Sequence, residues 1–103
     1  MPKTSCFVKF VTQPGQRDEL LGALREMLPA VAGEDGTEVY SFHTDKADDN
    51  ALWLFELYTD DAALATHSSS DAMKGLLGAL GGLLAEPPVM AFAEPTDAKG
   101  FDV

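Results

Sequence analysis

Two side chains near the middle of the sequence, His67 and Glu56, have the chemical character needed to move a proton. Imidazole exchanges a proton near neutral pH, so His67 is a candidate general base. Glu56 is the single charge in the apolar run 51–58, and a buried carboxylate must have a partner or be neutral. One interpretation is a proton-transfer site in which Glu56 bonds His67 and orients it.

Structural interpretations of both residues remain open. A histidine at the end of a short helix often bonds only a backbone carbonyl or a neighbouring carboxylate. A strand glutamate such as Glu56 often fixes architecture, or forms an ion pair at a dimer interface. For both residues the structural interpretation is slightly favoured.

Aromatic residues flank these candidates and could line a pocket. Strand alternation places Trp53 and Phe55 on one face of the run 51–58, with Glu56 and Tyr58 on the other. One face would meet the helices and a pocket and the other a partner subunit, and both assignments remain open. Tyr58 and Tyr40 also carry a hydroxyl that can bond a ligand oxygen. The predicted pocket residues are Tyr40, Trp53, Phe55 and Phe92.

The elements that must position these side chains follow from hydrophobic periodicity. Period-two patterns predict strands at 6–12, 37–43, 51–58 and 89–93. Helical spacing predicts a helix at 16–32 that ends in a left-handed glycine cap at Gly33. A short helix at 62–67 and a restarted helix from 71 that carries leucines as far as 84 follow, before Pro87-Pro88.

This order is β-α-β-β-α-β, which right-handed crossovers convert into a ferredoxin-like α+β fold. The expected fold is a four-stranded antiparallel sheet with its helices on one face. The other face would then be bare, and a second copy of the chain is its simplest cover. We expect a single domain over 1–103, with a core at about 6–93 and a tail at 94–103 that could lie on a partner.

The charge balance excludes several classes of partner. Seventeen acidic residues against seven lysines and arginines give a formal charge of −10, which disfavours nucleic acid and anionic membranes as partners.

Cys6 is the only cysteine, so an internal disulfide is excluded. The acidic loop after His43 has no spacing that fixes a metal geometry. Without a signal-like or membrane-length apolar segment, the expected location is cytoplasmic.

Three stretches of the sequence resemble the antibiotic biosynthesis monooxygenase (ABM) superfamily. They are the Pro14-Gly15 turn, the segment from Glu34-Asp35-Gly36 to Tyr40-Ser41-Phe42-His43, and the run 54–67. The run 54–67 corresponds to a family pattern in which a strand of the form Phe-x-Glu-x-Trp leads into the sequence Asp-x-x-Ala-Leu-x-x-His. The resemblance covers about 6–92, with departures at Leu54, Tyr58 and Thr37, where the family often has phenylalanine, tryptophan and cysteine.

The resemblance implies an obligate homodimer, a dimeric α+β barrel, with a pocket between each sheet and its helices. Family members include monooxygenases that oxidise phenolic or quinol-type aromatics with O2 and need no cofactor or metal. The haem-degrading branch has an asparagine in its first strand and a histidine late in its second helix. Here Val8 and Lys74-Gly75 occupy comparable stretches, so that chemistry is not expected.

Three functions follow as hypotheses. The first is a cofactor-independent monooxygenase for a small hydroxylated aromatic or quinol, with His67 as base or proton shuttle, Glu56 as its orienting partner, and Tyr58 or Tyr40 bonding the substrate oxygen. The second is an isomerase that moves a proton on a small keto-compound. The third is a non-catalytic dimeric module that binds a small apolar molecule.

Overall fold

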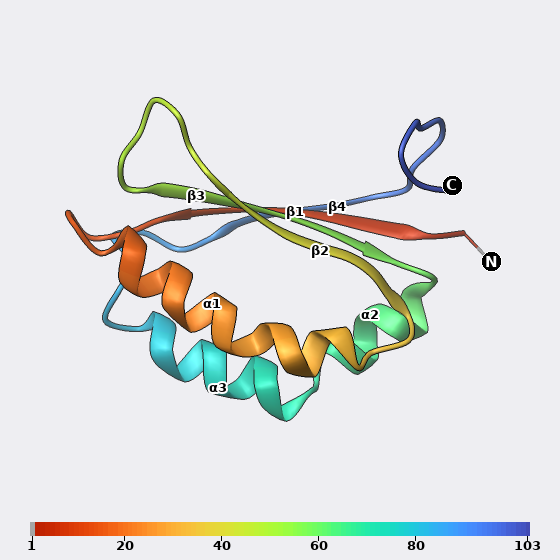
Figure 1. Cartoon of the computed structure of the whole chain (residues 1–103), viewed down its shortest axis with the longest axis horizontal. Helices are drawn as coiled ribbons and strands as arrows, with labels where there is room; N and C mark the ends of the chain where they lie inside the picture. Colours follow the sequence, from red (N-terminus) through yellow and green to blue (C-terminus); the bar gives the residue numbers. More distant parts are fainter. Residues whose placement is uncertain (1) are drawn as a thin grey trace.

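The computed structural model describes residues 2–103 and contains one sheet covered on one side by helices (Figure 1). All pairings are antiparallel, and the strand order is β2-β3-β1-β4. Among the described residues, no helix is long and apolar enough to cross a membrane. The predicted ferredoxin-like α+β arrangement is confirmed. The elements are β1 Thr4–Val11, α1 Arg17–Ala32, β2 Thr37–Thr44, β3 Ala51–Tyr58, α2 Asp61–Ser68, α3 Asp71–Leu80 and β4 Val89–Ala93.

The central strands β1 and β3 decide which side chains face the helices. Their register pairs Cys6 with Glu56 and Phe7 with Phe55, and paired residues project from the same face of a sheet. Cys6 and Glu56 are buried on the helix-covered face, whereas Phe7 remains exposed on the other. The alternation in β3 therefore places Tyr58 beside Glu56 on the covered face, and Trp53 on the helix-free face.

Helices α1 and α3 provide most of the cover. α1 buries Leu20, Leu24, Met27 and Val31 at helical spacing, and each such side chain contributes about 1.5–3 kcal/mol when fully buried. α3 adds Leu76 and Leu80 to the same core. The core therefore lies between these two helices and the covered face of the sheet.

Two predicted helix ends differ from the structure. Gly33 has φ −85 and ψ −2, which is right-handed, so the predicted left-handed cap is wrong; the Gly33 amide instead bonds the Ala30 carbonyl at 3.2 Å. The last helix ends at Leu80, earlier than predicted. Gly81-Gly82 follow at once, and consecutive glycines are poor helix formers.

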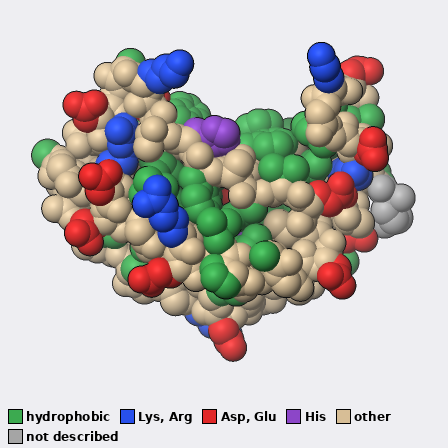
Figure 2. Space-filling view, in the orientation of Figure 1, with side chains coloured by type: hydrophobic (Ala, Val, Ile, Leu, Met, Phe, Trp, Pro, Cys, Tyr) green, Lys and Arg blue, Asp and Glu red, His purple; other side chains and the backbone are tan. Residues whose placement is uncertain are grey.

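The helix-free face is a hollow with raised ends. In Figure 1 the loop between β2 and β3 and the C-terminal segment rise above the sheet at opposite ends, and Figure 2 shows apolar side chains gathered between them. Phe7 is 46% exposed and Trp53 is 40% exposed on this face. The C-terminal segment lies on its own sheet, with the Phe101 ring 5.8 Å from that of Phe55.

Candidate active site

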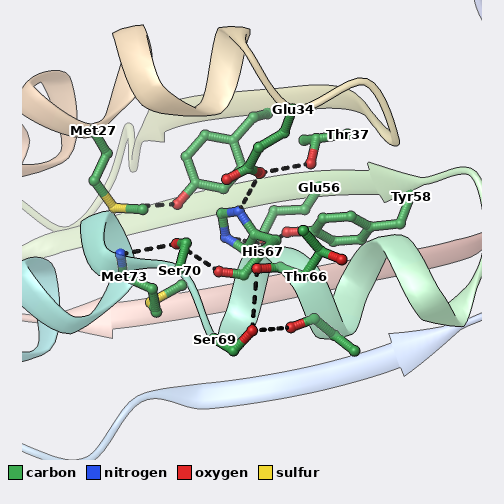
Figure 3. Close-up of polar contacts among 12 residues, drawn as sticks. Met27, Glu34, Thr37, Glu56, Tyr58, Thr66, His67, Ser69, Ser70 and Met73 are labelled. Carbon is green, nitrogen blue, oxygen red and sulfur yellow. Dashed lines mark hydrogen bonds and ion pairs between the residues drawn. The ribbon is translucent and has the colours of Figure 1, made fainter.

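The buried imidazole of His67 is the centre of the candidate site (Figure 3). Asp60 caps α2 by accepting a hydrogen bond from the Ala63 amide at 2.8 Å. The loop before β2 approaches this helix so closely that a Cβ on Gly36 would lie 2.4 Å from the Ala63 Cβ. This contact holds the first turn of α2 against the loop, and His67, in the last turn of the helix, is 1% exposed.

Glu34, in the loop after α1, holds one nitrogen of the imidazole. Its Oε1 lies 2.8 Å from His67 Nδ1, and the same oxygen accepts a hydrogen bond from the Thr37 hydroxyl at 2.9 Å. A carboxylate can only accept from the ring, so Nδ1 carries the proton. The other nitrogen, Nε2, is then the one that can accept a proton.

On the far side of the ring lies Glu56, which accepts a hydrogen bond from the Tyr58 hydroxyl. Glu56 Oε1 is 3.9 Å from His67 Nε2, an ion-pair distance that is too long for a hydrogen bond. Burial raises the pKa of Glu56 above its ordinary value of 4.5, while the bond from Tyr58 and the charge of His67 act in the opposite direction. Burial and Glu56 together also raise the pKa of Tyr58, so its hydroxyl remains a donor at neutral pH.

The His67 Nε2 atom is buried and has no hydrogen-bond partner among residues 2–103. Leaving a buried polar atom without a partner costs about 1–3 kcal/mol. The rings of Tyr40 and Tyr58 flank the imidazole, with centroids 5.2 and 5.4 Å away. Such an atom, held beside a carboxylate between aromatic rings, is suited to receiving a proton.

A cavity of about 80 Å³ lies between the sheet, α3 and β4. Tyr40 and Glu56 are its only residues with a polar side-chain group; the remaining wall is apolar. His67 does not line it, and reaches it through Glu56. The apolar wall consists of Val8, Phe10, Leu54, Met73, Leu76, Leu77, Leu80, Pro88 and Met90.

A family model described as "Antibiotic biosynthesis monooxygenase" (ABM) matches residues 5–77. This chain belongs to the ABM family. A Mycobacterium tuberculosis relative named "Putative monooxygenase Rv0793" is 30% identical over 89 residues, which are 86% of this chain and 87% of the relative.

Solved structures agree with the family assignment. The structure of Rv0793 matches with a TM-score of 0.86 at 28% identity, covering 93% of this chain and 97% of that one. The structure of NE2512 from Nitrosomonas europaea matches with a TM-score of 0.81 at 26% identity, and the match covers 100% of this chain and 98% of NE2512. A Caulobacter crescentus structure has a TM-score of 0.88 at 24% identity, covering 93% and 92%, and shows the shared fold.

Within this ABM fold, the predicted site residues fall into two groups. His67, Glu56, Tyr58 and Tyr40 come together on the helix-covered face. The orienting hydrogen bond to His67, expected from Glu56, comes instead from Glu34. The sequence places Glu34 in a turn, and only its position within a family-like stretch distinguishes it.

The other predicted pocket residues lie outside the cavity. Trp53 and Phe55 project from the helix-free face, because they alternate with Glu56 along β3. The Trp53 indole donates to Asp45 at 2.8 Å, and the Phe55 ring packs 5.3 Å from that of Phe7. Phe92 lies opposite Cys6, on the helix side of β4, but is 57% exposed and not part of the cavity wall.

The acidic loop after His43 has structural partners. Asp45 accepts from the Ala47 and Asp48 amides at 2.8 and 2.9 Å. The bond from the Trp53 indole, followed by these amide bonds, lowers the pKa of Asp45 to about 2. Among residues 2–103, no group of three or more histidine, cysteine or acidic residues is placed to hold a metal ion.

Proposed function

We propose that this ABM-family chain is a cofactor-independent monooxygenase that uses O2 to oxidise a small hydroxylated aromatic or quinol. The observation that carries the proposal is Glu56, a buried carboxylate with a raised pKa that is one of two polar groups in an apolar cavity. The unpaired Nε2 of His67 lies directly behind it. A proton acceptor with a second acceptor behind it suits the removal of a proton from a weakly acidic substrate.

The first step is removal of the substrate proton. Glu56 faces the cavity and takes the proton, because its raised pKa makes it a stronger base than a solvated carboxylate. His67 then shares that proton through Nε2. The Tyr58 hydroxyl is already bonded to Glu56. The Tyr40 hydroxyl has only a long contact of 4.0 Å to the Met27 sulfur, which it can exchange for a bond to the substrate oxygen that stabilises the anion.

The second step is oxidation by O2. The substrate anion gives one electron to O2, and the resulting substrate radical and superoxide combine with a proton to form a hydroperoxide. Loss of water from the hydroperoxide leaves a new carbonyl, so the reacting ring carbon, which is a CH2 group in the keto form of the phenol or quinol, and O2 become C=O and H2O. The proton stored at Glu56 and His67 returns to the oxygen during these steps. The apolar wall keeps bulk water from the intermediates.

Cavity size limits the substrate. About 80 Å³ is roughly half of the ~150 Å³ cavity known to hold a benzene molecule. Leu77 and Met90 form part of the wall and are both more than half exposed, so they can move outward and enlarge it. A single-ring quinol therefore suits the site better than a tricyclic phenol.

The functional unit in this proposal is a homodimer. The helix-free face exposes Phe7, Trp53 and, on the edge strand β4, Val89. Aromatic and aliphatic side chains gathered in this way are typical of an association surface. A second copy on this face would remove them from water.

An isomerase acting on a small keto-compound is the second candidate, favoured by the small cavity. It needs the same proton transfer at Glu56 but no O2. A catalysed shift of a proton under anaerobic conditions would support it.

The test is oxygen uptake by purified protein freed of metals and flavin, over single-ring quinols and anthrone-like phenols, with an autoxidation blank. The test variant is Glu56→Gln, which keeps the side-chain shape and the bond from Tyr58 but removes the base. The control is Glu38→Gln, because Glu38 is a carboxylate that bonds Lys3 and Thr59 away from the cavity. Uptake above the blank that is lost only in Glu56→Gln supports the proposal. Uptake equal to the blank on every compound overturns it.

A further inference from the structure

The imidazole of His67 lies between two carboxylates that differ in exposure. Glu56 Oε1, on the cavity side, is 3.9 Å from Nε2, and its side chain is 7% exposed. Glu34 Oε1, on the outer side, is 2.8 Å from Nδ1, and its side chain is 15% exposed. The two carboxylates therefore contact opposite nitrogens of one buried ring.

The contact with Glu34 is fixed from both ends. The Thr37 hydroxyl donates to the oxygen that faces His67, and the Thr37 amide bonds the Glu34 carbonyl at 3.1 Å. At the other end, the Ser70 hydroxyl donates to the His67 carbonyl at 2.8 Å and accepts from the Met73 amide. The bonds to the two carbonyls fix the backbone at both residues, and a turn of the Glu34 carboxylate would break its bonds to both Thr37 and His67.

Other titratable groups around His67 do not offer its Nδ1 an alternative partner. Tyr40 lies on β2 and Tyr58 on β3, and burial raises the pKa of both hydroxyls. The Cys6 thiol on β1 is buried as well, and its pKa is raised to about 12 by burial and by Glu56. All three remain uncharged at neutral pH, so Glu56 and Glu34 are the carboxylates that can balance a positive charge on the imidazole.

We propose that Glu34 is a positioning residue for the reaction in this cavity. It holds His67 in the tautomer with the proton on Nδ1, so that the Nε2 lone pair faces Glu56. When Glu56 passes the substrate proton to Nε2, the ring becomes an imidazolium and Glu34 supplies the negative charge beside it. The proton later returns through Glu56, and the ring recovers its starting tautomer. A carboxylate behind a histidine acts in the same manner in hydrolase triads.

This inference rests on the proposed proton transfer at Glu56, and two readouts separate its failure from that of the proposed function. The first is the ¹⁵N NMR spectrum of His67 in the free protein at pH 8, which reports the tautomer without any substrate. The second is kcat and KM for oxygen uptake. The variants are Glu34→Gln, whose amide can either donate to or accept from Nδ1, and Thr37→Val, which frees the Glu34 carboxylate. Glu38→Gln is the matched control.

In wild type and Glu38→Gln, we expect one His67 tautomer protonated at Nδ1. Glu34→Gln should give a mixture of His67 tautomers. It should also lower kcat by at least about tenfold with little change in KM, a loss comparable to that seen when the hydrogen-bond partner of a metal-ligating histidine is removed. Thr37→Val should change both readouts in the same direction by a smaller factor. A purely structural role would leave the tautomer and kcat unchanged.

The outcomes are distinguishable. If wild type takes up no oxygen but Glu34→Gln still mixes the tautomers, the oxygenase proposal fails and the positioning role of Glu34 stands. If wild type is active, and both variants keep the single tautomer and the wild-type kcat, the positioning role is overturned. If Glu34→Gln does not fold, Thr37→Val decides by the same two readouts.

Discussion

The two faces of the sheet differ in the burial and hydrogen bonding of their polar and aromatic side chains. On the covered face, Glu56, Tyr58 and His67 are buried, and almost every polar atom among them has a partner. On the helix-free face, Phe7 and Trp53 remain exposed. The alternation of one strand, β3, contributes to both faces, so under the proposed function adjacent residues would serve chemistry on one side and association on the other.

The largest effect that separates the two faces should come from Glu56→Gln. Removing the base should lower kcat for oxygen uptake by about 10²–10⁴-fold, the usual contribution of general base catalysis. The association state should not change, because Glu56 lies on the covered face. Stopped-flow or electrode measurements of uptake, with light scattering on the same samples, check both points. A variant that dissociates, or keeps full activity, would contradict the division between the faces.

The reciprocal change is Phe7→Glu on the helix-free face. A charge at the centre of an association surface should weaken dimerisation by at least about 100-fold, as expected for a buried aromatic anchor. Size-exclusion chromatography with light scattering, over a dilution series, gives the dissociation constant. The control is Leu28→Glu, because Leu28 is an exposed leucine of α1 on the opposite side of the molecule. Equal effects of the two substitutions would argue against a specific surface.

The raised pKa of Glu56 predicts a pH dependence of stability. The folded state binds the Glu56 proton more tightly than the unfolded state, so the stabilising effect is present below pH 4.5 and is lost as pH rises through the folded pKa. A tenfold difference in proton affinity between the two states corresponds to about 1.4 kcal/mol of unfolding free energy. Urea unfolding of wild type and Glu56→Gln from pH 4 to 8 should show that wild type loses stability relative to the variant. Glu38 and Asp45, whose pKa values are lowered, contribute stability that is lost only at the acid end of this range and below it, equally in wild type and variant, so their effect cancels in the comparison. Parallel curves would mean that Glu56 titrates normally.

Two glycines on the covered side should respond in opposite ways to alanine. At Gly36 the new Cβ would lie 2.4 Å from the Ala63 Cβ, so Gly36→Ala should destabilise the fold by about 1–3 kcal/mol. At Gly75, inside α3, nothing lies within 4 Å of the added Cβ. Gly75→Ala should therefore stabilise by up to about 1 kcal/mol. Thermal unfolding of both variants measures the difference, and a neutral Gly36→Ala would show that the loop does not hold α2 in place.

Much of the fold was predictable from local pattern. The predicted bounds of β3 and β4 match the structure, because apolar runs bounded by polar loops or prolines define both. The cap at Gly33 was not predictable, since glycine also adopts right-handed conformations and the following chain decides between them. Likewise, periodicity continued past Leu80, but Gly81-Gly82 ended the helix.

The candidate site was predictable only in part. Alternation correctly separates Glu56 and Tyr58 from Trp53 and Phe55, but it does not say which pair faces the helices. The partner of His67 was harder to predict, because Glu34 lies in a loop whose path depends on the contact between Gly36 and α2. Contacts between loops and helices carry no periodic signal in the sequence.

The central claim, that the covered cavity carries out a monooxygenation, is tested most directly with ¹⁸O2. A single-ring quinol that supports oxygen uptake is converted by wild type under ¹⁸O2, and the product is analysed by mass spectrometry beside Glu56→Gln and a protein-free blank. The account predicts one ¹⁸O atom in the product, with the second in water, and labelled product reduced to the blank level in Glu56→Gln. Product formed without label, or label retained in full by Glu56→Gln, would contradict it.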